Sequence, residues 1–256
     1  LAYKENGTKA LASKDFATYF EQNKNWLISY SAFSYLRDLH GTVDFNHWPT
    51  HASYDENAIV AMTKPTSKTY DSIAFFYYVQ YQLHLQLLNA TNYAHEHGVV
   101  VKGDIPIGVY RYGADAWQNR HLFHMDMQAG APPDDFAIAG QNWGFPTYNW
   151  KEMASDGYAW WKSRFDQMKY YFDAFRIDHI LGFFRIWSIP MNAVEGILGH
   201  FVPAIPISIN ELNAKHILVD HYRLTHPFIN ETILFQEFGY DNELIKKEYL
   251  KHIGDG

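Results

Sequence analysis

Two long stretches of the chain carry apolar residues at helical spacing. In residues 16–39 aromatic side chains recur at steps of three and four residues, and Gly41 follows as a suitable end. A second stretch can begin with Asp71 or Ser72 as its capping residue, and it repeats apolar positions at the same steps as far as Gly98. We therefore predict two helices, each with one apolar face turned towards a core.

Two helical stretches are each followed by a short apolar run that contains an aspartate near its end. Residues 99–106 form the first run, with Asp104. A helical stripe over residues 161–172 precedes the second run, residues 173–178, which ends at Asp178. A helix followed by a strand, twice, predicts an α/β fold with parallel strands. In a (β/α)8 barrel both aspartates would lie at the carboxyl ends of the strands, where functional side chains gather.

Two further stretches show no periodicity. Residues 41–69 contain Pro49, Pro65 and several small polar residues, which predicts a loop. Residues 110–148 are longer and rich in glycine and aromatic residues. A loop of that length in a compact domain is usually functional or disordered, and the aromatic content argues against disorder. We predict a folded lid or substrate-binding insertion between the two helix–strand units.

Composition restricts the classes of function. The 256 residues are 47% hydrophobic and carry a net charge of −7, which argues against a nucleic-acid partner because such binding needs a basic surface. No apolar run is long enough to predict a membrane span. The absence of cysteine excludes disulfides and fits a reducing, cytoplasmic compartment. Aromatic residues make up 18%, which fits a large aromatic core that uses most of them, and stacking on sugar rings is the alternative interpretation.

The nearest approach to a metal site is His121, His124 and Asp126. Two histidines three residues apart in an irregular stretch are weak evidence in a chain with 14 histidines, so no metal is expected. The sequence also lacks a glycine-rich phosphate loop of the nucleotide-binding kind, and no cofactor is expected.

The strongest candidates for catalytic side chains are Arg176, Asp178 and His179. In a strand, Arg176 and Asp178 lie on the same side, so the guanidinium can keep the carboxylate ionised and oriented. An ionised, oriented aspartate is the nucleophile of a retaining glycosidase or transglycosidase. An Arg–Asp pair at a strand end is also a common structural feature, and these residues alone leave both interpretations open.

Longer segments around these residues carry a family resemblance. Residues 172–187 (FDAFRIDHILGFFRIW) closely resemble the nucleophile strand of the amylomaltase, or disproportionating-enzyme, family of 4-α-glucanotransferases. Residues 102–108 (KGDIPIG) resemble the preceding barrel strand of that family, and residues 130–136 (GAPPDDF) with 140–146 (GQNWGFP) resemble its substrate loop. The segments are most similar to the long enzymes of plant cytosol and some bacteria. The resemblance implies part of an α-amylase-like (β/α)8 barrel.

The resemblance also implies a role for each matching residue. Asp178 would be the nucleophile, and Arg176 would orient it. The substrate-binding residues would be His179 and Asp104 near the donor sugar, and Asp134, Phe136, Gln141 and Trp143 on the acceptor side. The implied reaction is retaining transfer of α-1,4-glucan segments or glucose between malto-oligosaccharides or glycogen, without a cofactor.

The expected acid/base residue is missing from the sequence. In the family this glutamate stands in a Glu-Asp-Leu-Gly setting, which occurs nowhere among the 256 residues. Other carboxylates lacking that setting are Glu195, Glu211, Glu231 and Glu237. Only two of the eight helix–strand units of a barrel are recognisable. We therefore expect residues 1–256 to form one partial barrel domain, a fragment whose acid/base residue lies beyond residue 256.

Two other functions remain open at this point. An α-amylase-like hydrolase would use the same nucleophile with water as acceptor. A non-catalytic glucan-binding polypeptide would hold an oligosaccharide without turnover, because an absent general acid/base costs about 10²–10⁴-fold in rate.

Overall fold

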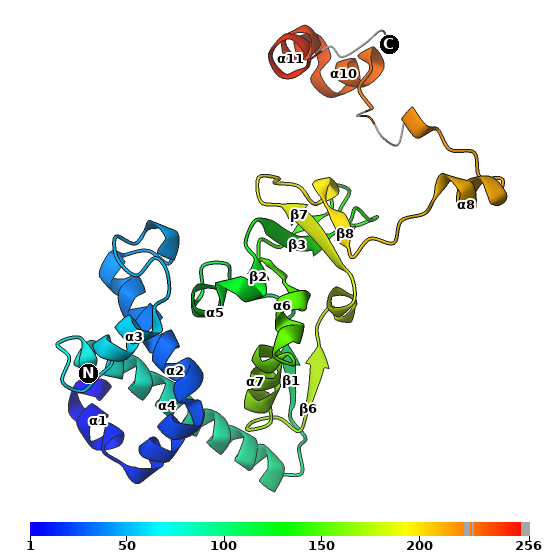
Figure 1. The fold of residues 1–256 in the computed structure, drawn as a ribbon. Helices are drawn as coiled ribbons and strands as arrows, with labels where there is room; N and C mark the ends of the chain where they lie inside the picture. Colours follow the sequence, from blue (N-terminus) through cyan, green and yellow to red (C-terminus); the bar gives the residue numbers. More distant parts are fainter. Residues whose placement is uncertain (223–225, 227, 252–256) are drawn as a thin grey trace. The chain divides into compact units, whose positions relative to one another are not determined.

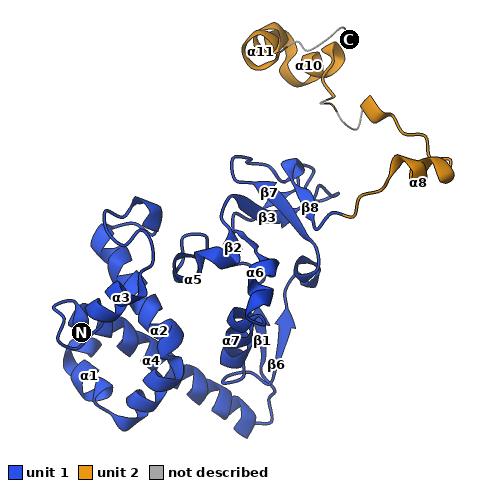
Figure 2. Ribbon diagram, in the orientation of Figure 1, with its two compact units in different colours: residues 1–204 blue, residues 205–256 orange. Residues whose placement is uncertain are grey.

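The structure, a computed structural model, describes residues 1–222, 226 and 228–251. It contains two compact units, Leu1–Ala204 and Ile205–Gly256 (Figure 2). The two units are distinguished by the contacts within each of them, and such contacts do not show which residues make up the catalytic domain. A single catalytic domain over residues 1–256 therefore stays a prediction.

Helices dominate the first part of unit 1 (Figure 1). They are α1 (Ala2–Leu11), α2 (Lys14–His40), α3 (Glu56–Met62) and α4 (Tyr70–Glu96). The Ser13 hydroxyl begins α2 by accepting a hydrogen bond from the backbone N–H of Phe16 at 3.1 Å. Gly41 ends the helix in the left-handed conformation, with a φ of 67°. The helix predicted over residues 16–39 is confirmed.

Helices α2 and α4 pack against each other through an aromatic core. Its buried members are Phe16, Tyr19, Leu27, Ile73, Ala74, Tyr77 and Tyr81. The rings of Phe16 and Tyr81 meet edge to face with centroids 5.4 Å apart, a favourable aromatic geometry. The apolar stripe predicted for α4 is buried only in its first half, because Leu83 is already 51% exposed.

Three sequence predictions in this region need correction. Residues 41–69 are not only a loop, since the short helices η1 (Phe45–His47) and α3 lie within them. Asp71 does not cap α4; its carboxylate accepts a hydrogen bond from the hydroxyl of Tyr3 at 2.9 Å, a partner too distant in sequence for local patterns to reveal. Residues 99–101 are β-branched but precede the strand.

Two parallel strands form the α/β part of unit 1. Helix α4 leads into β1 (Lys102–Ile105), and α7 (Ala159–Met168) leads into β6 (Ala174–Ile177). The strands pair in parallel, with Asp104 opposite Arg176. The predicted α/β class is confirmed, while the described residues contain no closed barrel, because β1 and β6 form a two-stranded sheet.

The stretch 110–148 is folded. It contains α5 (Ala114–Gln118), η2 (Arg120–Leu122), β2 (Phe123–His124), β3 (Met127–Ala131), β4 (Gln141–Asn142) and β5 (Thr147–Tyr148). Strand β3 joins an antiparallel sheet of order β4-β3-β7-β8 with β7 (Ile186–Pro190) and β8 (His200–Val202), while β2 pairs with β5. The short helices η3 (Ile180–Phe183) and η4 (Gly196–Leu198) flank β7.

A second core joins this insertion to the strand pair. Its buried members are Ile105, Ile107, Leu122, Phe123, Tyr148, Met153 and Trp161. Helix α6 (Trp150–Ser155) supplies Met153, and its start is capped by Asn149, whose side chain accepts from the backbone N–H of Glu152 at 3.2 Å. Asparagine is a favoured residue at this position because its side-chain oxygen satisfies a free backbone N–H. The shared core fixes the carboxyl ends of β1 and β6 against the insertion.

Unit 2 is helical. Its described elements are α8 (Ile209–Ala214), α10 (Glu231–Phe238), η5 (Gly239–Asp241) and α11 (Asn242–Tyr249). Ser208 and Glu211 form a reciprocal capping box at the start of α8. Leu234 is the one buried side chain among the described residues of this unit, and Leu218 and Tyr240 are almost fully exposed.

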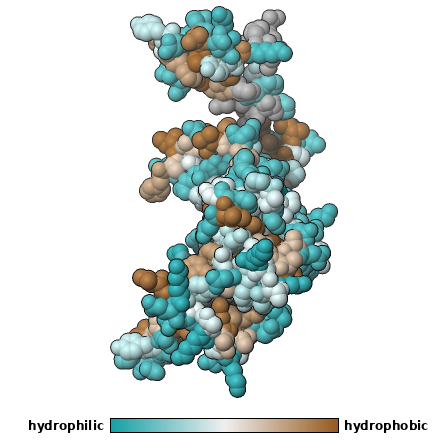
Figure 3. All heavy atoms as spheres, turned by 90° about the vertical axis from the view of Figure 1, so that its left-hand side faces the viewer, coloured by the Kyte–Doolittle hydropathy of each residue, from teal (hydrophilic) through white to brown (hydrophobic). Residues whose placement is uncertain are grey.

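Apolar side chains reach the surface in separate patches, as one face of the molecule shows (Figure 3). Within the described ranges, none of the helices has the length and apolar character needed to cross a bilayer.

Candidate active site

The parallel strand pair brings Asp104 and Arg176 into direct contact. The Arg176 Nε donates to Asp104 Oδ1 at 3.0 Å, and its Nη2 donates to Oδ2, so the pair is bidentate. These hydrogen bonds hold the pKa of Asp104 below its usual value and raise the pKa of Arg176. Both residues therefore carry their charges at neutral pH.

Asp178 lies just past the end of β6 and shares the same guanidinium. Its backbone N–H donates to the carbonyl of Ile105 at 3.3 Å, which ties the residue to β1. Its Oδ1 is 3.7 Å from Arg176 Nη2, an ion-pair distance without a close hydrogen bond. The strand register aligns Arg176 with Asp104, so Asp104 takes its close hydrogen bonds, and the role of Arg176 in orienting Asp178 stays a prediction. Asp178 thus keeps its oxygen lone pairs available while a positive charge stands beside it.

His179 and Trp143 form the aromatic wall next to Asp178. His179 has a positive φ of 47°, which turns the chain sharply after Asp178. The Trp143 ring meets the imidazole edge to face, with centroids 4.9 Å apart, and stacks on Phe145 at 5.6 Å. The Trp143 indole N–H donates to Gln141 Oε1 at 3.0 Å. The structure therefore brings together Gln141, Trp143 and His179 as a connected group.

A cavity of about 390 Å³ opens beside Asp178. It is lined by Pro106, Ile107, Gly108, Val109, Tyr110, Arg111, Trp143, Gly144, Phe145 and Asp178. Its two charged residues, Asp178 and Arg111, have opposite signs, and the rest of the lining is apolar or aromatic. Such a lining suits a neutral, hydroxyl-rich ligand, because a ring face can pack on the apolar face of a sugar. This cavity is our candidate active site.

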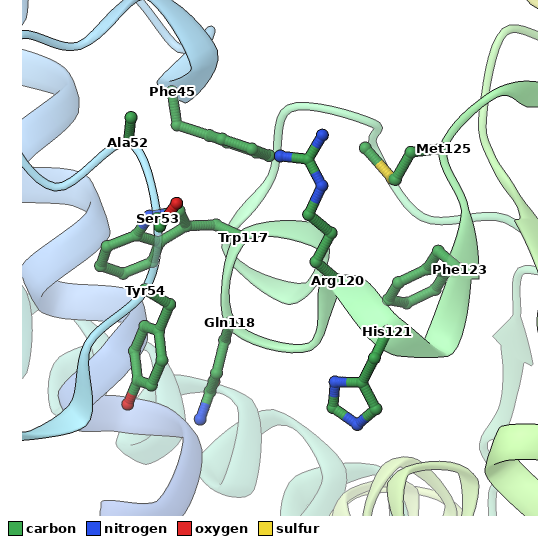
Figure 4. Close-up of a pocket in the computed structure, with 10 residues that line it drawn as sticks. All are labelled: Phe45, Ala52, Ser53, Tyr54, Trp117, Gln118, Arg120, His121, Phe123 and Met125. Carbon is green, nitrogen blue, oxygen red and sulfur yellow. The ribbon is translucent and has the colours of Figure 1, made fainter.

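A larger cavity of about 550 Å³ lies elsewhere in unit 1 (Figure 4). Its lining comes from the 45–54 segment and from residues 117–125, and it includes Arg120, His121 and Gln118 but no carboxylate. A site without a carboxylate offers no nucleophile for glycosyl transfer. Size alone therefore does not identify the reactive cavity.

Asp134 and Phe136 are not among the residues that line the cavity beside Asp178. The Asp134 carboxylate accepts hydrogen bonds from the backbone N–H groups of Phe136 at 2.9 Å and Ala137 at 2.7 Å, so it shapes its own turn. The Phe136 side chain is 98% exposed. Their role in binding substrate stays a prediction.

The cavity also contains residues that sequence reasoning missed. Arg111 and Phe145 line it. Arg111 lies outside the segments that resemble the family, and Phe145 lies within residues 140–146 but was not predicted to be a site residue. The structure shows why Phe145 requires a glycine at position 108, because a Cβ there would lie 2.4 Å from Cδ1 of its ring. Elsewhere, the part of the chain that the structure describes holds no cluster of three or more potential metal-binding side chains.

The chain resembles known proteins along most of its length. The sequence profile of the family described as 4-alpha-glucanotransferase matches residues 1–250. The chain belongs to this family.

Individual relatives of the chain carry the family name. It is 44% identical to the 4-alpha-glucanotransferase DPE2 of Oryza sativa subsp. japonica, over 97% of the chain and 26% of the rice protein. It is 34% identical to the 4-alpha-glucanotransferase of Chlamydia pneumoniae, over 76% of the chain and 35% of that protein. The resemblance read from the sequence is confirmed. The chain spans about a quarter to a third of the length of these relatives.

Solved amylomaltases have a similar fold. The Streptococcus agalactiae amylomaltase in complex with acarbose matches with a TM-score of 0.64 and 27% identity, covering 75% of this chain and 40% of the other. The amylomaltase of Corynebacterium glutamicum matches with a TM-score of 0.58 and 25% identity, covering 73% and 24%. These matches support the expected α/β architecture of this family.

Proposed function

We propose that this chain carries the nucleophile side of a retaining 4-α-glucanotransferase site that acts on α-1,4-glucans. The observation that supports this most is the position of Asp178. Its carboxylate lines a cavity with Trp143, and its Oδ1 is 3.7 Å from a guanidinium that is already neutralised in part by another carboxylate. An ionised carboxylate at an aromatic cavity is what attack on a sugar carbon requires.

In the proposed reaction, an oxygen of Asp178 attacks the anomeric carbon of the donor glucan. The bond from that carbon to the bridging oxygen breaks, and the leaving 4-oxygen takes a proton from a general acid. The 4-hydroxyl of an acceptor glucan then attacks the glycosyl ester, returns a proton to the same group, and releases Asp178. Two inversions give net retention, and water in place of the acceptor would give hydrolysis.

The surrounding residues take supporting roles in this proposal. Arg176 places a positive charge beside Asp178 and orients it, and Asp104 fixes the plane of Arg176 through its bidentate contact. His179 donates to a hydroxyl of the donor sugar. Trp143 supplies a stacking face, and Gln141 orients that indole. Asp134 and Phe136 contact the acceptor.

Asp104 is not suited to be the second catalytic carboxyl group. A general acid for glycosyl transfer needs a raised pKa, so that it still holds a proton near neutral pH. The hydrogen bonds from Arg176 lower the pKa of Asp104 instead. Residues 1–256 contain no Glu-Asp-Leu-Gly segment. We infer that the acid/base residue is a different carboxyl group, supplied from outside these residues.

The substrate class rests on two supports. The aromatic cavity suits a pyranose ring, and the solved amylomaltase of Streptococcus agalactiae is a complex with acarbose. The reaction needs no cofactor, because both displacements use side-chain oxygen and proton transfer alone.

A disproportionation assay tests this proposal. The protein is incubated with maltotriose, or with maltose plus glycogen, and the products are separated by size. A ladder of longer maltodextrins with glucose supports transfer if Asp178→Asn abolishes it while the exposed Asp135→Asn does not. Transfer that persists in Asp178→Asn at the wild-type rate contradicts the assigned nucleophile.

The second candidate function is glucan binding without turnover, which the proposed absence of the acid/base group favours. Isothermal titration with acarbose distinguishes it: heat of binding without any product ladder points to a glucan-binding polypeptide. Glucose released without longer products points to hydrolysis.

A further inference from the structure

Arg111 is an isolated buried charge. Its side chain is 4% exposed, and no other charged residue in the described ranges is buried. Within those ranges no carboxylate lies within ion-pair distance of it, and burial lowers its pKa, while Tyr112 and Asp126 act in the opposite direction. Burial of an unpaired charge is costly, so a residue of this kind needs compensating hydrogen bonds.

Three backbone carbonyls provide that compensation. The Arg111 Nη1 donates to the carbonyl of Met125 at 2.6 Å, and Nη2 donates to that of Met127 at 2.5 Å. The Nε donates to the carbonyl of Gly144 at 3.1 Å. A planar guanidinium can span three acceptors at fixed angles, which the single ammonium of lysine cannot do.

The Gly144 contact reaches the aromatic wall of the cavity. Gly144 has a φ of 76°, and its N–H donates to the Asn142 side chain at 3.0 Å. The N–H of Trp143 donates to the carbonyl of Ala129 at 3.0 Å. The peptide groups on both sides of Trp143 are therefore fixed by hydrogen bonds. Arg111 in addition binds the carbonyl of Gly144, the residue after Trp143. The Trp143 ring then contacts His179, the neighbour of Asp178.

We propose that Arg111 is a positioning residue that fixes Trp143 at the wall of the Asp178 cavity and thereby sets the affinity for an α-glucan. The proposal rests on the function proposed above, because it assigns Trp143 to sugar binding. Arg111 itself reacts with nothing. It acts by holding the Gly144 carbonyl, so that the indole meets the sugar without first having to be ordered.

Fluorine NMR of protein labelled with 5-fluorotryptophan tests this. The chain has eight tryptophans, and the Trp143 line is assigned with Trp143→Phe. In Arg111→Met we expect the Trp143 line to shift towards free 5-fluorotryptophan and to broaden, while the lines of distant tryptophans stay in place. Isothermal titration should show about a tenfold weaker affinity for acarbose, the effect of losing one hydrogen bond to a charged group.

Arg164→Met is the matched control. Arg164 also donates to a backbone carbonyl, that of Pro106 at 3.1 Å, but it makes no contact with Gly144. We expect it to leave the Trp143 line unchanged. Arg111→Lys keeps the positive charge but cannot donate to all three carbonyls, so it should shift the Trp143 line as well. If Arg111→Met does not fold, Arg111→Lys provides the test.

The inference is overturned if the Trp143 line stays in place in either folded variant, or if all eight lines move together as in a general loss of structure. It is also overturned if Arg111→Lys restores both the line and the affinity, because charge alone would then suffice. A wild-type protein that binds no acarbose contradicts the proposed function, whereas the Trp143 line still decides the role of Arg111.

Discussion

Substitution of Gly108 by alanine tests how tightly the cavity is built. A Cβ at position 108 would lie 2.4 Å from Cδ1 of Phe145, whereas ordinary contacts begin near 3.4 Å, so the ring must move by about 1 Å. Adding a methyl group to a filled site usually costs about 1–3 kcal/mol. We expect the free energy of unfolding of Gly108→Ala to fall by that amount, and acarbose affinity to fall because Phe145 stacks on Trp143.

Urea unfolding followed by near-UV circular dichroism measures the stability, and titration calorimetry measures the affinity. Phe145→Ala provides the control, because removing the ring removes the clash. In that background Gly108→Ala should cost almost nothing, which gives a coupling energy of about the same size as the single-mutant loss. A Gly108→Ala protein as stable as wild type, with unchanged affinity, would refute the packing argument.

Three further outcomes are expected. Tyr148→Phe removes a hydroxyl that donates to the buried carbonyl of Ile107, so the free energy of unfolding should fall by about 1–3 kcal/mol in urea; an unchanged midpoint contradicts this. Because Arg176 lowers the pKa of Asp104, their pairing stabilises the fold above about pH 4 and is lost as the pH falls through the lowered value. The difference in urea midpoint between wild type and Asp104→Asn should therefore shrink in acid, and a difference that grows there opposes the argument. Phe136→Ala should change the unfolding free energy by less than about 0.5 kcal/mol, because the ring is exposed, yet weaken the binding of long malto-oligosaccharides in titration calorimetry. Unchanged binding opposes the predicted acceptor contact.

The sequence revealed those parts of the fold whose signals are local. The helix before Gly41 and the strand at Asp178 follow from side-chain periodicity, and the parallel pairing of β1 with β6 follows from the repeated helix–strand order. The loop over residues 41–69 was predicted wrongly because α3 is short and its one buried side chain, Ile59, gives too little periodicity. Tertiary packing, rather than local propensity, stabilises that helix.

Only those residues of the candidate site that lie in segments resembling the family could be predicted from the sequence. The group at Asp178 could be named from its residues, but the preference of Arg176 for Asp104 depends on strand register, which the sequence does not state. Arg111 was missed for a related reason. Its partners are backbone carbonyls, which every residue has, so no pattern of side chains indicates them.

The most direct test of the account is a search for the covalent intermediate at Asp178. α-Maltosyl fluoride is a suitable donor because fluoride leaves without a proton, so the first step can proceed without a general acid, while the proposed absence of the base from residues 1–256 would slow release. Mass spectrometry of the intact protein and of its peptides follows the label. The account predicts one added maltosyl group, on the peptide that contains Asp178 and absent from Asp178→Asn. A label on another carboxylate, or none on a folded protein shown to bind acarbose, would contradict it.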